Sequence, residues 1–271
     1  MNLGYHCPLC SNPLTKNANT LRCINNHSFD FAKEGYVNLL PVQQKNSKQP
    51  GDSLEMVQAR RAFLERGFYA FLQTALGQII HQLDAENIID LGCGEGFYTQ
   101  ALANNTHANV YGVDISKSAI KYAAKRYSNC HFSVASISQA PFKEQFADVL
   151  VSVFAPLFEQ ELARLAKPAA TLVVASPGPW HLKELKSFIY SNINEHTQID
   201  TPAGFIQSSQ ILITEHVALN FDDAKNLIMM TPFAWKFRPE HWSALQEKGE
   251  HNVTLSFYVT QFTKQDNINN D

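Results

Sequence analysis

The sequence feature that most constrains the fold is a short apolar segment that leads directly into a glycine-rich turn. Residues Asn87–Leu91 predict a buried strand, glycines stand at positions 92, 94 and 96, and a helical pattern follows over Phe97–Ala103. Glycine accepts positive φ angles and lets a ligand approach bare backbone at the start of a helix. Such a strand, turn and helix form the repeating unit of a parallel α/β sheet, which excludes an all-helical or an all-strand fold.

Strands and helices continue to alternate along the rest of the chain. Six further strands are predicted, over Asn109–Val113, His131–Ala135, Ala147–Phe154, Thr171–Ala175, Gln210–Leu219 and Val253–Phe262. Helices are predicted over Ser116–Arg126, Glu159–Ala166 and His181–Ser191, and two more meet at an elbow near Gly67. The last strand alternates apolar and polar residues, which indicates antiparallel strands at one sheet edge. The predicted fold class is therefore α/β, with a doubly wound, mostly parallel, seven-stranded Rossmann-like sheet.

Four residues of metal-binding type stand in the first 27 positions. They are Cys7, Cys10, Cys23 and His27, in the pattern C-x2-C-x12-C-x3-H. This spacing predicts a tetrahedral zinc site, and four protein ligands leave no coordination position open for catalysis, so the ion would be structural. Free thiols or a redox C-x-x-C motif are the alternatives, but a redox motif would follow a strand and open a helix. Residues 1–40 contain so little apolar surface that we expect them to need a metal to fold.

The residues typical of a linker divide the chain into two parts, and the overall composition limits the classes of protein to which it can belong. Residues 41–55 are polar with two prolines and a glycine, and they predict a linker between a zinc module (1–40) and a larger domain (56–271). The formal net charge of −3 excludes a polycationic nucleic-acid coat protein. Apolar runs of 18 residues are absent, so no membrane helix is expected. The odd, clustered cysteines and an N-terminus without a secretory pattern favour a cytoplasmic protein.

Acidic side chains distinguish the glycine turn from a dinucleotide site. Asp90 precedes the turn, Glu95 lies within it, and Asp114 ends the next strand, where an acid can accept both hydroxyls of a ribose. The glycine spacing is G-x-G-x-G rather than G-x-G-x-x-G. Carboxylates would repel a pyrophosphate but suit a ligand with ammonium and sulfonium groups. The turn therefore favours S-adenosylmethionine over NAD, with an ordinary βα turn as the remaining alternative.

Several stretches resemble a known family. The turn Asp90–Gly96 (DLGCGEG), followed by Asp114, resembles class I S-adenosylmethionine methyltransferases. The stretches that resemble bacterial 23S ribosomal RNA guanine-N1 methyltransferases are the zinc cluster with HSFDFAKEGYVNLLPV, then Gly51-Asp52-Ser53, MVQARRAFL, PGPWHL and MTPFAW. The resemblance spans nearly the whole chain, with two departures: Ala169-Ala170 replaces a glycine pair, and Phe154 stands where the family pattern tends to have tyrosine.

That resemblance implies a methyltransferase sheet with a small zinc-ribbon-like N-terminal domain, and methyl transfer from S-adenosylmethionine to N1 of a guanine in a hairpin of 23S ribosomal RNA. It implies that one zinc ion is held by Cys7, Cys10, Cys23 and His27 in a module that helps to grip RNA. Cofactor contacts would come from Tyr69, Asp90, Gly92, Gly94, Glu95, Gly96, Phe97, Asp114 and His181. The resemblance also suggests a homodimer, which the sequence itself does not show.

The sequence does not assign a general base. Glu95, Asp114 and His181 are candidates, and for His181 packing against the cofactor is favoured over proton transfer. Phe154 either stacks on the target base or belongs to the core.

Residues 1–75 carry eight cations and five acids, so Lys33, Lys45 and Lys48 are expected to contact the RNA backbone. The alternative functions are methylation of a small molecule, which would not need a zinc module, and RNA binding by a zinc-ribbon protein with a decayed cofactor fold.

Overall fold

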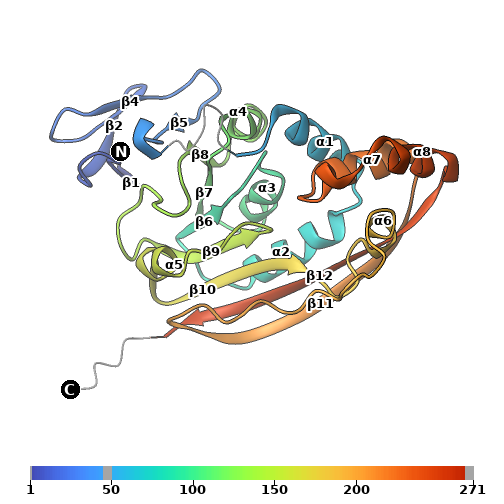
Figure 1. Cartoon of the computed structure of the whole chain (residues 1–271). Helices are drawn as coiled ribbons and strands as arrows, with labels where there is room; N and C mark the ends of the chain where they lie inside the picture. Colours follow the sequence, from blue (N-terminus) through green and yellow to red (C-terminus); the bar gives the residue numbers. More distant parts are fainter. Residues whose placement is uncertain (1, 45–50, 266–271) are drawn as a thin grey trace.

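The structure, a computed structural model, describes residues 2–44 and 51–265 and is organised around one large sheet (Figure 1). Its eight strands follow the order β11-β12-β10-β9-β6-β7-β8-β5. Their bounds are β5 Val37–Asn38, β6 Asn87–Leu91, β7 Asn109–Asp114, β8 His131–Val134, β9 Ala147–Val153, β10 Ala166–Pro177, β11 Phe205–Leu219 and β12 His251–Lys264. The pairings from β10 to β5 are all parallel, whereas β12 is antiparallel to both β10 and β11.

The seven predicted strands are confirmed, with three differences in detail. The antiparallel strands predicted at one sheet edge are confirmed as β12 and β11, but β11 forms the edge itself, while β12 lies between β10 and β11 and is buried along most of its length. Strand β10 begins at Ala166 rather than Thr171, with a register shift between these two residues. Ala169 lies within this irregular stretch at a φ of 58°, a conformation that glycine adopts without strain. Ala169 therefore has a backbone conformation that suits glycine, the residue of the family pattern at this position. The eighth strand, β5, comes from the N-terminal segment.

Helices cover the sheet on both sides and join its strands. Their bounds are α1 Leu54–Glu65, α2 Ala70–His81, α3 Phe97–Asn104, α4 Lys117–Arg126, α5 Glu159–Leu165, α6 Lys183–Lys186, α7 Phe221–Met229 and α8 Pro239–Lys248, with short 3-10 turns at Val42–Gln44 and Ala234–Lys236. The elbow between α1 and α2 is confirmed, since Gly67 has a φ of 82°. Ser53 caps α1, because its hydroxyl accepts a hydrogen bond from the backbone of Met56. Among residues 2–44 and 51–265, no helix is long and apolar enough to cross a membrane.

The helix predicted over His181–Ser191 is wrong in extent, and two helices were not predicted. Only Lys183–Lys186 is α-helical, because Leu182 adopts a left-handed conformation with a φ of 60° that interrupts the helix before it can include His181. The unpredicted helices α7 and α8 both lie between the last two strands. Helix α7 packs mainly against α1, and α8 buries only Leu245, so the periodic apolar signal in the sequence is short.

The N-terminal segment packs on the sheet rather than apart from it. It forms a four-stranded sheet from β1 Asn2–His6, β2 Pro13–Asn17, β3 Thr20–Arg22 and β4 Ser28–Asp30. Leu3, Tyr5 and Leu14 share one hydrophobic core with Ile89 and Tyr111 of the large sheet. The division into 1–40, 41–55 and 56–271 stays a prediction, and within its linker residues 45–50, with Lys45 and Lys48, lie outside the described residues.

Candidate functional site

The four predicted metal ligands come together at one end of the N-terminal sheet. The ligand atoms of Cys7, Cys10, Cys23 and His27 all lie within 4.8 Å of one another. Cys10 Sγ and Cys23 Sγ are 3.7 Å apart, and His27 Nδ1 lies 3.4 Å from Cys7 Sγ and 3.5 Å from Cys23 Sγ. A zinc ion with Zn–S bonds of about 2.3 Å requires sulfur atoms about 3.8 Å apart in a tetrahedron. The donor set and its spacing therefore fit one zinc ion through His27 Nδ1.

Two tight turns present these ligands. Ser11 closes the first turn, where its N–H donates to the carbonyl of Cys7 at 2.8 Å, and Asn26 closes the second by donating to Cys23 at 3.0 Å. Both residues have positive φ angles, 56° and 63°. The side-chain amide of Asn12 donates to Cys10 Sγ at 3.4 Å, which stabilises charge on that sulfur and fixes its direction.

The glycine turn after β6 is too crowded for side chains at two of its three glycines. Gly92 and Gly96 have φ angles of 80° and 81°. A Cβ on Gly92 would lie 2.5 Å from the Cβ of Ala155, and one on Gly96 would lie 3.0 Å from Ala123, Phe132 and Tyr127. Gly94, with a φ of 54°, is less crowded, and its N–H donates to Asp114 Oδ2 at 2.9 Å. The turn is thus fixed to the end of β7.

Two of the predicted acids have different environments. Asp114 accepts from the backbone of Gly94 through Oδ2 and from Ser116 through Oδ1, at 2.9 and 2.7 Å. Burial raises the pKa of this carboxyl, and the two backbone hydrogen bonds oppose that rise. Asp90 is 1% exposed, accepts from the Thr99 hydroxyl at 2.6 Å, and has a pKa raised to about 7 by burial. Asp90 therefore ties β6 to α3 inside the protein, while Asp114 stands at the edge of the turn.

Arg60 of α1 lies over the turn, although the sequence did not predict it as a residue of the site. Its Nη2 contacts Asp52 Oδ2 at 2.5 Å, and its Nη1 lies 3.7 Å from Glu95 Oε2. Glu95 is buried, and this oxygen has no hydrogen-bond partner in the described part of the chain. A Cβ on Gly94 would lie 3.6 Å from Arg60 Nη1. The only signal in the sequence is that Arg60 lies in the stretch MVQARRAFL. An arginine on a helix more often faces solvent, so this signal did not single out Arg60.

A second group of predicted residues surrounds Phe257 of β12. The ring centroids of Tyr69, His181 and Phe154 lie 5.0, 4.7 and 5.3 Å from the ring centroid of Phe257. Phe154 follows β9, has a φ of 57° and is 44% exposed, so it is not a core residue. A bulky side chain rarely adopts this conformation, so Phe154 has a strained backbone at the carboxyl end of β9.

His181 is present as a neutral imidazole. Burial lowers its pKa to about 3, with a further contribution from Lys186. Its Nδ1 accepts a hydrogen bond from the backbone of Ser256 at 3.2 Å, so Nε2 carries the proton. His181 therefore presents a donor and not a free lone pair, which argues against a role as general base.

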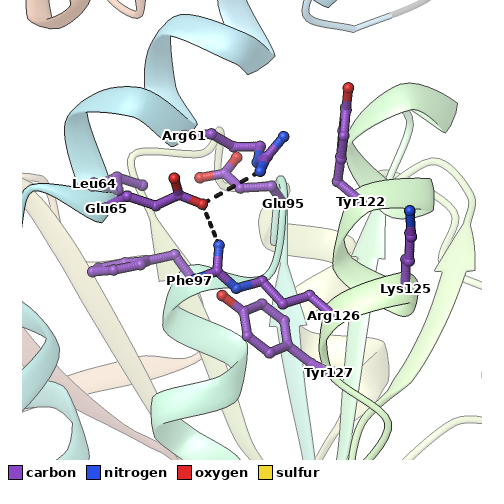
Figure 2. A pocket seen from close by; sticks show the side chains of 9 residues that line it. All are labelled: Arg61, Leu64, Glu65, Glu95, Phe97, Tyr122, Lys125, Arg126 and Tyr127. Atoms are coloured by element: carbon purple, nitrogen blue, oxygen red, sulfur yellow. Dashed lines mark hydrogen bonds and ion pairs between the residues drawn. The ribbon is translucent and has the colours of Figure 1, made fainter.

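Phe97 is separated from the other predicted contacts. It begins α3, where its carbonyl accepts from Gln73 at 2.8 Å, and its ring lines a pocket of about 460 Å³ between α1 and α4 (Figure 2). Glu95 reaches the same pocket from the glycine turn. The structure thus brings together Arg60, Gly94, Glu95 and Asp114 on one side, and Tyr69, Phe154 and His181 on the other.

Comparisons with known proteins agree with both parts of this arrangement. A zinc-ribbon family model described as "RlmA, N-terminal" matches residues 5–48, and one described as "Methyltransferase domain" matches residues 82–234. The 23S rRNA (guanine(748)-N(1))-methyltransferase of Streptomyces fradiae is 30% identical in an alignment of 267 positions that covers 94% of this chain and 94% of its own. The protein "Putative 23S rRNA (guanine-N(1)-)-methyltransferase YxjB" of Bacillus subtilis (strain 168) is 30% identical over 93% of this chain and 94% of its own.

A solved structure from Bacillus halodurans C-125, described as a "putative methyltransferase", shares the fold with a TM-score of 0.51 and 16% identity, over 72% of this chain and 99% of its own. Together the matches span the zinc cluster and the glycine turn. S-adenosylmethionine and one structural zinc ion are the cofactors that this fold and this donor set take. The chain belongs to the family of bacterial 23S rRNA (guanine-N1)-methyltransferases.

Proposed function

We propose that this protein transfers a methyl group from S-adenosylmethionine to N1 of a guanine in a hairpin of 23S ribosomal RNA. The observation that carries the proposal is the combination, in one chain, of an acid-lined glycine turn and a zinc cluster packed on the same sheet. A methyltransferase of small molecules would not need the second feature, and an RNA-binding protein without activity would not need the first. Because the proposed substrate is rRNA, we also propose that the protein acts in the cytoplasm.

The bound cofactor supplies an electrophilic methyl group, and the residues of the chain hold and orient its two ends. Asp114 accepts hydrogen bonds from the ribose hydroxyls. It uses the carboxylate lone pairs that are not occupied by the backbone N–H groups of Gly94 and Ser116. The backbone of Gly92–Gly96 gives the close approach that a side chain would block. Tyr69 and His181 pack at the other end of the site, next to Phe257. Holding both reactants in line provides most of the rate acceleration for such a displacement.

The target guanine is proposed to enter beside Phe154. This ring is partly exposed at the carboxyl end of β9, and an aromatic face there can stack on a base that has left the RNA helix. Loss of the N1 proton requires stabilisation of negative charge on the guanine, and the Nε2–H of His181 can donate to its O6. Phe154 lacks the hydroxyl of the tyrosine in the family pattern, so stacking is its proposed role.

Arg60 and Glu95 suit the amino-acid end of the cofactor, which carries one ammonium and one carboxylate. We expect Arg60→Ala to weaken binding of S-adenosylmethionine about 10- to 100-fold, because a charge-assisted hydrogen bond to the carboxylate is lost. Decarboxylated S-adenosylmethionine, which lacks that carboxylate, should bind the variant and the unmodified chain almost equally. Titration calorimetry measures all four affinities.

The matched control for Arg60→Ala is Arg61→Ala. Arg61 is the next residue on α1, but its guanidinium lies over the ring of Tyr122 at 4.4 Å and pairs with Glu65 rather than with Glu95 of the turn. This control should leave both affinities close to those of the unmodified chain. If Arg60→Ala weakened the two cofactors by the same factor, Arg60 would not contact the carboxylate.

The resemblance also suggests a homodimer. The edge strand β11 exposes Ile206, Ile211 and Leu212, and an apolar strand edge of this length suits pairing with a second copy. Sedimentation of the purified chain as a monomer at micromolar concentration would contradict the dimer.

The direct test of the proposed function is primer extension on 23S rRNA from cells with and without the gene. Methylation at N1 blocks Watson–Crick pairing, so a reverse-transcriptase stop at one guanine should be present with the gene and absent without it. An unchanged pattern of stops would contradict the assignment to rRNA.

A further inference from the structure

The distribution of charge along the chain has a feature that the proposed cofactor site does not explain. Between Asp114 and Glu144 there are five Lys and Arg residues and no Asp or Glu, although the whole chain has a net charge of −3. Four of these cations, Lys117, Lys121, Lys125 and Arg126, belong to α4, which carries no acid. Such a block of positive charge favours a polyanionic partner.

Three of the lysines form a line on one face of α4. Lys117, Lys121 and Lys125 follow one another at intervals of four residues, so they share a face with steps of about 6 Å along the axis. All three are exposed. Lys121 Nζ lies 3.6 Å from Oε1 of Glu34 in the N-terminal segment. Within residues 2–44 and 51–265, Lys117 and Lys125 have no acidic partner, so their charge is available to a ligand.

The two ends of this lysine line lie next to sites already described. Lys117 directly follows Ser116, whose backbone N–H donates to Asp114 at the cofactor turn. Lys125 lines the pocket between α1 and α4, together with Arg126, Tyr122 and Tyr127 (Figure 2). Figure 1 shows α4 between the N-terminal segment and α1. The line of lysines therefore connects the zinc-bearing segment, the cofactor turn and the pocket.

The pocket has the composition of a site for an unstacked base. Arg61 lies over the ring of Tyr122 at 4.4 Å, and Phe97 and Tyr127 add aromatic surface. Arg61 and Arg126 both contact Oε1 of Glu65, which holds these two cations in place (Figure 2). Aromatic and guanidinium planes stack on bases of any sequence, while nearby cations hold the phosphates. An acidic protein segment would use the lysines but would not need this aromatic surface.

We propose that the lysine face of α4 and the pocket beside Tyr122 form an RNA-binding surface, which holds the phosphate backbone and one unstacked base of the RNA that is methylated. This inference rests on the proposed function. The RNA backbone would then contact α4 of the methyltransferase domain as well as the N-terminal part of the chain, which the sequence alone predicted as the main site of phosphate contacts.

The test measures binding of a 23S rRNA hairpin at several salt concentrations. In the variant Lys117→Ala/Lys125→Ala, two phosphate contacts are lost, so the slope of log Kobs against log salt should fall by about 1.4 to 1.8. The affinity at low salt should fall about tenfold or more. The matched control is Lys225→Ala/Lys248→Ala, which removes two exposed lysines of α7 and α8 and changes the net charge equally. That control should change the affinity by less than twofold.

A third variant tests the pocket. Tyr122→Leu removes a stacking ring without a change in charge, so it should weaken binding at every salt concentration and leave the slope unaltered. Calorimetry with S-adenosylmethionine should give the same affinity for all these variants, which shows that they are folded. If the hairpin is bound and methylated but the Lys117→Ala/Lys125→Ala variant keeps the full slope, or the control loses as much, the surface is not the RNA-binding surface. If the unmodified chain neither binds nor methylates the hairpin, the proposed function fails and this inference fails with it.

Discussion

Removal of the zinc ion, by a chelator or by Cys10→Ser, is expected to destabilise the whole chain and not only its first forty residues. The reason is the shared core: the ring of Tyr5 contacts those of Tyr111 and Phe142, and Gly4 lies against Phe146. Strand β5 also pairs with β8 of the large sheet. Zinc binding in small modules contributes about 10–16 kcal/mol to their folding, so losing even part of it should lower the free energy of unfolding by about 3 kcal/mol or more.

Tryptophan fluorescence during urea unfolding measures this coupling. All three tryptophans, Trp180, Trp235 and Trp242, lie outside the N-terminal segment, so their signal reports on the methyltransferase part alone. The unfolding midpoint in this signal should fall when zinc is lost. The matched control is Cys130→Ser, a partly buried thiol outside the metal cluster, which should leave the zinc content at one ion per chain. Loss of zinc with an unchanged tryptophan transition would show that the N-terminal segment folds independently.

Gly92→Ala is expected to abolish measurable binding of S-adenosylmethionine. The new Cβ would lie 2.5 Å from that of Ala155, so the turn or the segment after β9 must move, and the φ of 80° adds backbone strain. Both segments border the proposed cofactor and base sites. A shift there of about 1 Å is enough to disrupt a preorganised site.

The matched control for Gly92→Ala is Gly67→Ala. Gly67 has a similar φ of 82°, but a Cβ there would have no atom within 4 Å. It should therefore show the backbone cost alone, about 1 kcal/mol of stability, with cofactor affinity retained. Calorimetry and thermal unfolding of the two variants separate the effects. Normal cofactor binding by Gly92→Ala would mean that the cofactor does not lie against this turn.

The parts of the fold that could be predicted from sequence were those with strong local signals. The strand Asn87–Leu91 is a short, mainly apolar segment that leads directly into glycines, and its bounds in the structure are the same. The metal cluster was predictable because four ligands of the correct types stand at the spacing that two tight turns require. In both cases neighbouring residues in the sequence determine the geometry.

The parts that could not be predicted depend on contacts between distant segments. Strand β5 is only two residues long, and its pairing with β8 has no periodic signal. Arg60 is one of two adjacent arginines on α1, and only the packing of that helix decides that Arg60 faces Glu95 while Arg61 faces Tyr122. The same holds for His181, whose hydrogen bond from the backbone of Ser256 in β12 argues against a role as base that the sequence left open.

The measurement that tests the central claim most directly is methyl transfer by the purified, zinc-loaded chain. The chain is incubated with S-adenosylmethionine carrying an isotopically labelled methyl group and with a 23S rRNA hairpin, and the RNA is then digested to nucleosides for mass spectrometry. We predict that the label appears in 1-methylguanosine, that it disappears when Gly92→Ala replaces the unmodified chain, and that Gly67→Ala retains it. Label in another nucleoside, or a hairpin that stays unlabelled while the chain binds the cofactor, would contradict the proposed function.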